Sequence, residues 1–134
     1  MKEIYLIQGI IFQEGSVFGL GNRPGIGTAV TVQEAMLYSM FHAIVGPSDD
    51  GKTLCGHMND QWGNSEITNF KISEEEMSFT KKYTNRPPIN YLFQLSSNKN
   101  SVWLGKYISF DCGKGVAKCI VVPIDENFFE PTIL

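Results

Sequence analysis

Cysteine is scarce in this 134-residue chain, and its three copies, Cys55, Cys112 and Cys119, follow no paired spacing. An odd number of cysteines at irregular intervals does not build a disulfide framework and is typical of a reducing compartment. We therefore expect buried free thiols, Cys119 being the clearest case, and a cytoplasmic protein. Cys55 and His57 stand one residue apart, which is not a structural-zinc spacing, so we predict neither a metal nor a cofactor.

Long apolar runs and an excess of basic residues are also missing. No apolar stretch approaches the roughly 20 residues that a membrane-spanning helix needs. Residues 1–4 lead directly into a strand pattern with no cleavage-site signature, so we expect no signal peptide. The formal charge is -3 and the isoelectric point is near 5.3. With no basic excess to neutralise phosphates, we expect no nucleic-acid partner and no membrane partner.

Alternating apolar and polar side chains dominate the second half of the chain. Turn signals, such as the acidic run 74–76 and the prolines 87–88, separate the alternating segments. The predicted strands are 68–72, 77–83, 89–95, 103–107 and 116–124. Consecutive short strands of this kind predict a mainly β protein, an antiparallel meander closed into a barrel, within one domain spanning residues 1–134.

The first half of the chain is less regular. Residues 4–12 read as a strand in which Gly9 indicates a bulge or a close approach of another backbone. A glycine-rich loop follows at 15–27. Thr31 and Glu34 then form a capping box ahead of apolar residues at helical spacing, and Gly46 and Pro47 end the pattern. We therefore predict one buried α-helix over about residues 32–45, and a further short strand over 54–58.

The last predicted strand breaks the alternation, because residues 119–122 are all apolar. Such a run predicts that both faces of the strand are covered, one by the barrel interior and one by the helix or a partner subunit. The tail also carries Phe128 and Phe129, which we expect to pack on the domain or on another copy of it. A homodimer is therefore a possible partner state.

Residues 46–53 match the phosphate-loop pattern GxxxxGK[ST] letter for letter. The motif requires a strand before it and a helix after it, whereas here a predicted helix precedes it and no helix pattern follows. Asp49 and Asp50 would also place negative charge inside an anion cradle. We interpret the segment as a solvated loop, with nucleotide binding as a weaker alternative. The glycine spacing over 21–27 resembles a dinucleotide-binding turn but lacks the parallel sheet that such a site needs.

No catalytic constellation is present in the sequence. His42 falls among apolar neighbours and is interpreted as a hydrogen-bonded core residue. The acidic run 74–76 is interpreted as a solvated turn. An enzyme would be indicated by a shifted titration of Lys81, His42 or His57 in a cleft. Without such a sign, we expect a non-enzymatic protein.

Aromatic side chains and one lysine provide the main lead to a binding site. Lys81 lies on an otherwise apolar strand face, so it must reach solvent or meet a negative partner. Two alternatives follow: a filled core with the lysine at the rim, or a pocket in which Lys81 meets an anionic ligand between aromatic faces. The candidate ligand-binding residues are Lys81, Tyr83, Tyr91, Phe93, Trp103 and Tyr107.

The segments 79–83, 91–93 and 103–107 together resemble the strand pattern of calycin-like β-barrels, the group that contains lipocalins, fatty-acid-binding proteins and avidins. The lipocalin G-x-W signature is absent because Trp62 precedes its glycine, and no residue role is carried across. The resemblance implies a barrel that binds a small apolar or anionic molecule. The alternative is an interaction or structural domain with a filled barrel, acting through a homodimeric surface that includes Ile120 and Val122.

Overall fold

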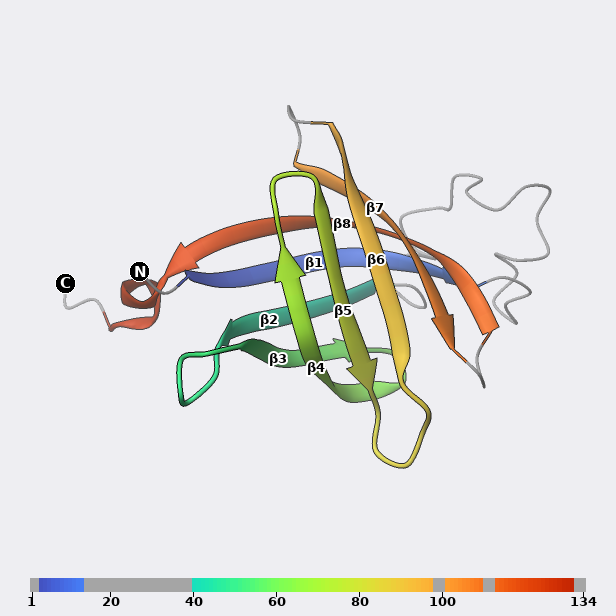
Figure 1. Cartoon of the computed structure of the whole chain (residues 1–134), viewed down its shortest axis with the longest axis horizontal. Coiled ribbons are helices and arrows are strands. Elements are labelled where there is room, and N and C mark those ends of the chain that lie inside the picture. Colours follow the sequence, from blue (N-terminus) through green and yellow to red (C-terminus); the bar gives the residue numbers. More distant parts are fainter. Residues whose placement is uncertain (1–2, 14–39, 98–100, 110–112, 132–134) are drawn as a thin grey trace.

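The computed structural model describes residues 3–13, 40–97, 101–109 and 113–131. Its elements are β1 (Glu3–Gln13), β2 (Met40–Pro47), β3 (Leu54–Asp60), β4 (Gly63–Ile72), β5 (Glu76–Lys82), β6 (Ile89–Ser97), β7 (Val102–Ser109), β8 (Gly113–Asp125) and the 3-10 helix η2 (Glu126–Phe129). Each strand pairs antiparallel with the next, and β8 pairs with β1, so the meander closes into a barrel (Figure 1). The predicted mainly β class and closed antiparallel barrel are confirmed.

Strict alternation of buried and exposed residues explains why these segments are strands. On β5, Met77, Phe79 and Lys81 face inward, and on β7 Trp103 and Tyr107 do so. Successive side chains of a strand point to opposite faces, so one face of each strand contributes to a common interior. The barrel interior is therefore the hydrophobic core.

Aromatic rings fill much of this interior. Phe79 stacks on Tyr91 with ring centroids 4.9 Å apart and on Phe70 at 6.0 Å, and Tyr91 contacts Tyr107 at 5.3 Å. Large rings fit because small residues lie opposite them: a Cβ on Gly105 would come within 2.4 Å of the Phe93 ring. Interiors packed in this way leave few voids larger than a water molecule.

The α-helix predicted over 32–45 is wrong wherever the structure describes that range, because residues 40–45 belong to strand β2. Phe41, Ala43 and Val45 are buried, whereas Met40, His42 and Ile44 face outward. Apolar residues on both faces conceal this period of two and imitate a buried helix. The proposed Thr31 cap and residues 32–39 lie outside the described residues, as does the glycine-rich loop 15–27. Within the described residues, η2 is the only helix.

No helix among the described residues covers the outer face of the last strand, so of the two predicted covers only a partner subunit stays a prediction. Ile120 and Val122 are 44% and 46% exposed on the outside of β8. Phe128 and Phe129 on η2 are exposed as well, so these two side chains do not pack on the barrel, and their packing on another copy stays a prediction. No helix within the described ranges is long and apolar enough to cross a membrane.

Gly9 shows the close approach that its position in the first strand predicts. A Cβ there would meet the Lys118 carbonyl oxygen at 2.3 Å and the Cys119 Cβ at 2.6 Å. The pairing of β1 with β8 runs without a register shift from Glu3 to Gln13, so the glycine serves close packing and not a bulge.

Candidate functional site

Lys81 finds its negative partner inside the protein. Its Nζ lies 2.9 Å from Oδ2 of Asp60 and 3.0 Å from the hydroxyl of Tyr83, which also donates to Asp60. The side chains of Lys81 and Asp60 are 2% and 1% exposed. Lys81 Nζ also lies 4.8 Å from the ring centroid of Tyr83 and 5.4 Å from that of Tyr91. A buried lysine is tolerated only when paired and hydrogen-bonded, and this cluster supplies both.

The sequence did not predict Asp60 as a site residue, because the predicted strand 54–58 ends two positions before it. The signal that identifies it is parity along β3: Met58 is buried, so Asp60, two residues further on, points to the same side. The strand pattern, extended by two residues beyond 54–58, thus indicates that Asp60 faces inward, but the register through β4 decides that it meets Lys81.

The six predicted ligand-binding residues all belong to the inner face, but they do not meet at one point. Lys81, Tyr83 and Tyr91 lie together, and Tyr107 touches Tyr91. Trp103 lies four positions before Tyr107 on β7, about 14 Å away along the strand. Phe93 packs over Gly105. The described arrangement is that of a core layer, not of a lined cavity.

An opening in the barrel wall lies between β3 and β4. Their pairing stops at Gly56 and Ile67, and the register of β4 then shifts between Thr68 and Lys71. Asn69 within this bulge has a φ of 54°, a left-handed conformation that asparagine tolerates better than most residues. The bulge turns β4 away from the start of β3, which continues to pair with β2. The result is a pocket of about 670 Å³.

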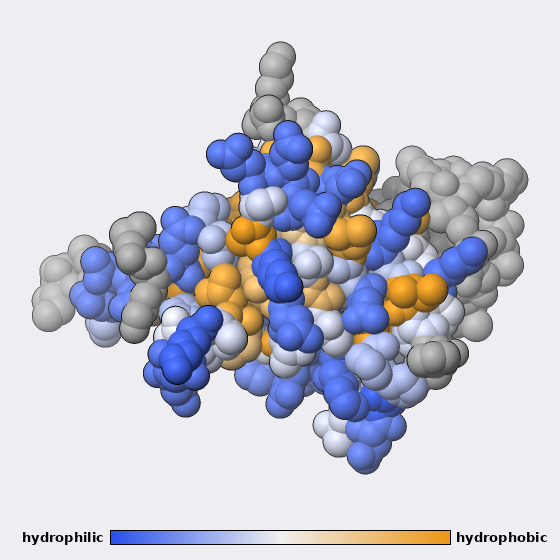
Figure 2. All heavy atoms as spheres, in the orientation of Figure 1, coloured by the Kyte–Doolittle hydropathy of each residue, from blue (hydrophilic) through white to orange (hydrophobic). Residues whose placement is uncertain are grey.

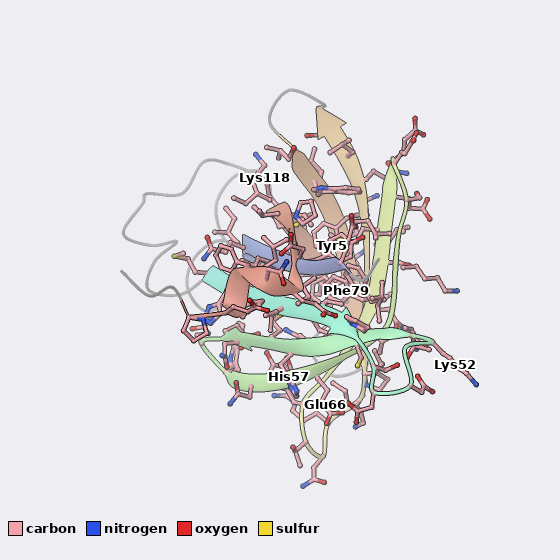
Figure 3. The ribbon with its side chains drawn as sticks, turned by 90° about the vertical axis from the view of Figure 1, so that its left-hand side faces the viewer. Tyr5, Lys52, His57, Glu66, Phe79 and Lys118 are labelled. Atoms are coloured by element: carbon pink, nitrogen blue, oxygen red, sulfur yellow. The ribbon has the colours of Figure 1, made fainter. Side chains whose placement is uncertain are left out.

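The floor of this opening is aromatic. Tyr5 and Phe70, with ring centroids 5.7 Å apart, line it together with Leu54. Through Phe70 the floor continues into the stack of aromatic rings in the core. Figure 3 looks toward this end of the barrel, with Tyr5 and Phe79 inside its outline and Lys52 projecting from the β2–β3 turn. A flat apolar group would meet ring faces here.

Charged groups surround the opening. Lys52 and Lys71 line it from the β2–β3 turn and from β4, and neither ammonium group forms an ion pair within the described residues. Glu3 also lines it and accepts a hydrogen bond of 2.7 Å from the Tyr5 hydroxyl. Burial and the Glu3 carboxylate raise the pKa of Tyr5 to about 12, so this hydroxyl stays a neutral donor. The two lysines leave the rim with a net positive charge.

The phosphate-loop motif over 46–53 is the turn between β2 and β3. Asp50 Oδ1 accepts hydrogen bonds from the Ser48 hydroxyl at 2.6 Å and from the Lys52 backbone N–H at 2.9 Å. These bonds, the Ser48 bond first, lower the pKa of Asp50. A carboxylate of the loop itself therefore accepts from the Lys52 N–H, and a strand, not a helix, follows the motif.

The two described histidines lie outside the barrel. The prediction that His42 is a core residue is wrong, because His42 lies at an outward position of β2 and is exposed, as is His57 on β3. His42 Nε2 lies 3.5 Å from Asn59 Nδ2. Within the described ranges, no three His, Cys, Asp or Glu side chains form a metal-ligand group.

The buried thiol of Cys119 predicts that the free energy of unfolding depends on pH. Burial raises the pKa of its thiol from 9.0 to about 12. The unfolded chain loses this proton near pH 9 while the folded chain keeps it, so the free energy of unfolding falls as pH rises from about 9 to about 12. One proton contributes a slope of up to about 1.4 kcal/mol per pH unit. Urea unfolding across this range should show the fall.

The Cys119→Ala variant should flatten that slope, whereas Cys55→Ala, which removes a less buried thiol, should not. Tyr5 also lowers the free energy of unfolding as pH rises above 10, because its pKa is raised as well. Tyr5→Phe should therefore remove the part of the slope that is due to Tyr5. An unchanged slope in Cys119→Ala would contradict this assignment.

Comparison with protein-family models, with curated proteins and with solved structures gives no match in any of the three.

Proposed function

We propose that this chain is a non-enzymatic binding protein that holds a small anionic molecule with a flat apolar body in the opening between β3 and β4. The observation that supports the proposal is the aromatic floor of Tyr5 and Phe70 beneath the two lysines, Lys52 and Lys71. The size of the opening, about 670 Å³, falls within the usual range for small-molecule pockets. A calycin-like relationship and a cytoplasmic location are part of the same proposal.

The opening is favoured over the predicted site around Trp103 and Tyr107 on two grounds. Phe70 is as buried as those two side chains but lines the opening, whereas a ligand at Trp103 and Tyr107 would have to displace packed rings. Lys81, the predicted contact for an anion, is already bonded to Asp60. An anionic ligand at Lys81 would have to replace that carboxylate and leave it unpaired, which is costly in a buried place.

Each part of the opening has a separate role in the proposal. Tyr5 and Phe70 present ring faces to the apolar body of the ligand. Lys52 and Lys71 attract its anionic group, at modest strength because both are exposed to solvent and screened by salt. The neutral Tyr5 hydroxyl, held by Glu3, fixes the orientation of its ring.

Fluorescence titration with anilinonaphthalene sulfonate, an aromatic sulfonate, tests the proposal. The Lys52→Glu/Lys71→Glu variant exchanges attraction for repulsion at two points on the rim. The two exchanges change the charge of the rim by four units. Each unit contributes at most about 1 kcal/mol in water and only a fraction of that after salt screening, so we expect the Kd for the probe to rise by at least about tenfold. Both side chains are exposed, so folding should be unaffected.

The matched control is Lys106→Glu/Lys114→Glu, which makes the same change in net charge away from the opening. Its Kd should stay within about twofold of the unmodified protein because long-range effects are screened. Equal weakening in both variants would show that net charge alone attracts the probe. No binding by the unmodified protein would refute the site for this class of ligand.

A further inference from the structure

Both histidines of the chain lie on neighbouring strands of the barrel and face the same side. The sequence contains two histidines, His42 and His57. Each is an exposed, outward residue, His42 on β2 and His57 on β3. In the pairing of these strands, His42 lies opposite Asn59, and His57 lies opposite Ile44. The two imidazole rings therefore belong to diagonal neighbours on one face, whose Cα atoms stand about 7–8 Å apart and whose Cβ atoms stand somewhat closer.

This diagonal spacing suits two ligands of one metal ion. Imidazole nitrogen binds Zn²⁺ at about 2.0–2.1 Å, so two such nitrogens on the same ion lie roughly 3 Å apart. Each imidazole extends beyond its Cβ, so rings that start from diagonal positions can converge to that separation. His42 Nε2 already lies 3.5 Å from Nδ2 of Asn59, the next residue after His57 on the same face of β3. Turning the Asn59 amide over brings its oxygen to the same place as a third ligand.

The surroundings of the two rings favour a cation. Their register neighbours on the adjacent strands are Gln8, Ile44, Asn59 and Glu66, and among these only Glu66 is charged. Figure 3 shows Glu66 beside His57. A carboxylate in this position can accept a hydrogen bond from the second ring nitrogen of a ligating histidine, which fixes the ring and raises its basicity.

Apolar side chains flank the two rings. His42 and His57 both line a groove of about 350 Å³, together with Leu6, Ile44 and Val122 among others. Figure 2 shows, by contrast, that hydrophilic side chains dominate the face over β4, β5 and β6. An apolar shell limits the access of water and lowers the local dielectric, which strengthens the attraction between a metal ion and its ligands. The groove and the opening between β3 and β4 share no lining residue, so this site does not rest on the proposed function.

We infer that His42 and His57 together bind one divalent transition-metal ion, Cu²⁺, Ni²⁺ or Zn²⁺, on the outer wall of the barrel. Imidazole suits these ions, and the affinity of such a site is generally highest for Cu²⁺. Within the described residues no three His, Cys, Asp or Glu side chains are grouped around a metal position, so Asn59 and water complete the coordination. Mg²⁺ and Ca²⁺ prefer oxygen ligands and do not fit.

Isothermal titration calorimetry of the full chain with Zn²⁺, its thiols kept reduced, tests the site. The unmodified protein should bind one equivalent of Zn²⁺ and no Mg²⁺. His42→Gln and His57→Gln should each raise the Kd for Zn²⁺ at least about tenfold, the smallest loss expected even when only a supporting residue is removed. Because both rings hold the same ion, the double variant should bind hardly more weakly than either single variant. Both side chains are exposed, so folding should be unaffected.

The matched control is Cys55→Ala. Cys55 precedes His57 by two residues on the same face of β3 and is itself a possible zinc ligand, but it lines the opening and not the groove. The Kd of this variant should stay within about twofold of the unmodified protein. Two equivalents in the unmodified protein, one of which survives in each histidine variant, would show independent sites and contradict a shared ion. No binding by the unmodified chain, undiminished binding by the double histidine variant, or loss of binding in Cys55→Ala would overturn the inference.

Discussion

Replacing Asp60 with alanine should cost about 3–5 kcal/mol of folding stability, which is a large part of the total for a domain of this size. The change leaves the Lys81 ammonium group buried among aromatic rings without its counter-charge. The Tyr83 hydroxyl loses the same acceptor. Urea unfolding followed by circular dichroism would measure the loss, provided that the variant still folds.

A second variant keeps this prediction testable if Asp60→Ala fails to fold. Asp60→Leu/Lys81→Met removes both charges and fills the space with apolar atoms, so it should retain most of the stability or exceed the original. Exposed Asp49→Ala serves as the control for loss of a carboxylate and should change stability by less than about 0.5 kcal/mol. Equal losses in the single and the double variant would show that the ion pair is not what holds this region.

Replacing Gly105 with alanine should cost about 1–3 kcal/mol through overpacking. The added Cβ would lie 2.4 to 2.7 Å from three carbon atoms of the Phe93 ring. That ring is fully buried and stacks on Tyr91 and Phe79, so it has little room to move. Thermal unfolding would report the loss as a lower Tm.

Adding Phe93→Leu should relieve this clash, so the double variant should be more stable than the two separate losses predict. Gly46→Ala is the matched control, since its Cβ would meet only Ile4 at 3.4 Å. If Gly105→Ala were as stable as Gly46→Ala, the packing of Phe93 against β7 would be contradicted.

The barrel was predictable because its signals are local. Between residues 68 and 107, each predicted strand alternates clearly and turn residues separate it from the next, so order and direction follow from sequence alone. The acidic run at 74–76 lies at the predicted turn before β5. Closure was predictable too, because a meander of this length protects its edge strands by closing.

The prediction of a helix over residues 32–45 was wrong for a physical reason. In β2 the outward residues Met40 and Ile44 are nearly as apolar as the inward ones, so no period of two is visible. The capping box at Thr31 then supported a helical reading. Because both faces of β2 are apolar, both were predicted to be buried. In the described barrel, the outer face of β2 is exposed. Ile120 and Val122 on β8 have the same apolar outer face, which is exposed in the described barrel.

The candidate site could not be predicted from local sequence patterns. Lys81 and its aromatic neighbours were recognised as inward-facing, but the identity of its partner depends on the register between β3 and the strands beyond it. The opening depends on a bulge at Asn69, a residue that reads as an ordinary strand position. Tyr5 and Phe70 meet across the barrel from β1 and β4, so only the closed fold brings them together.

A two-dimensional NMR titration of the 15N-labelled chain with anilinonaphthalene sulfonate tests the central proposal most directly. The account predicts that the amide resonances of Leu54, Cys55, Asn69 and Phe70 shift in proportion to occupancy, whereas those of Trp103 and Tyr107 shift little. Shifts centred on Trp103, Tyr107 and Lys81 would instead place the ligand in the barrel interior. Shifts centred on Ile120 and Val122 would place it on the outer face, and either result would contradict the proposed site between β3 and β4.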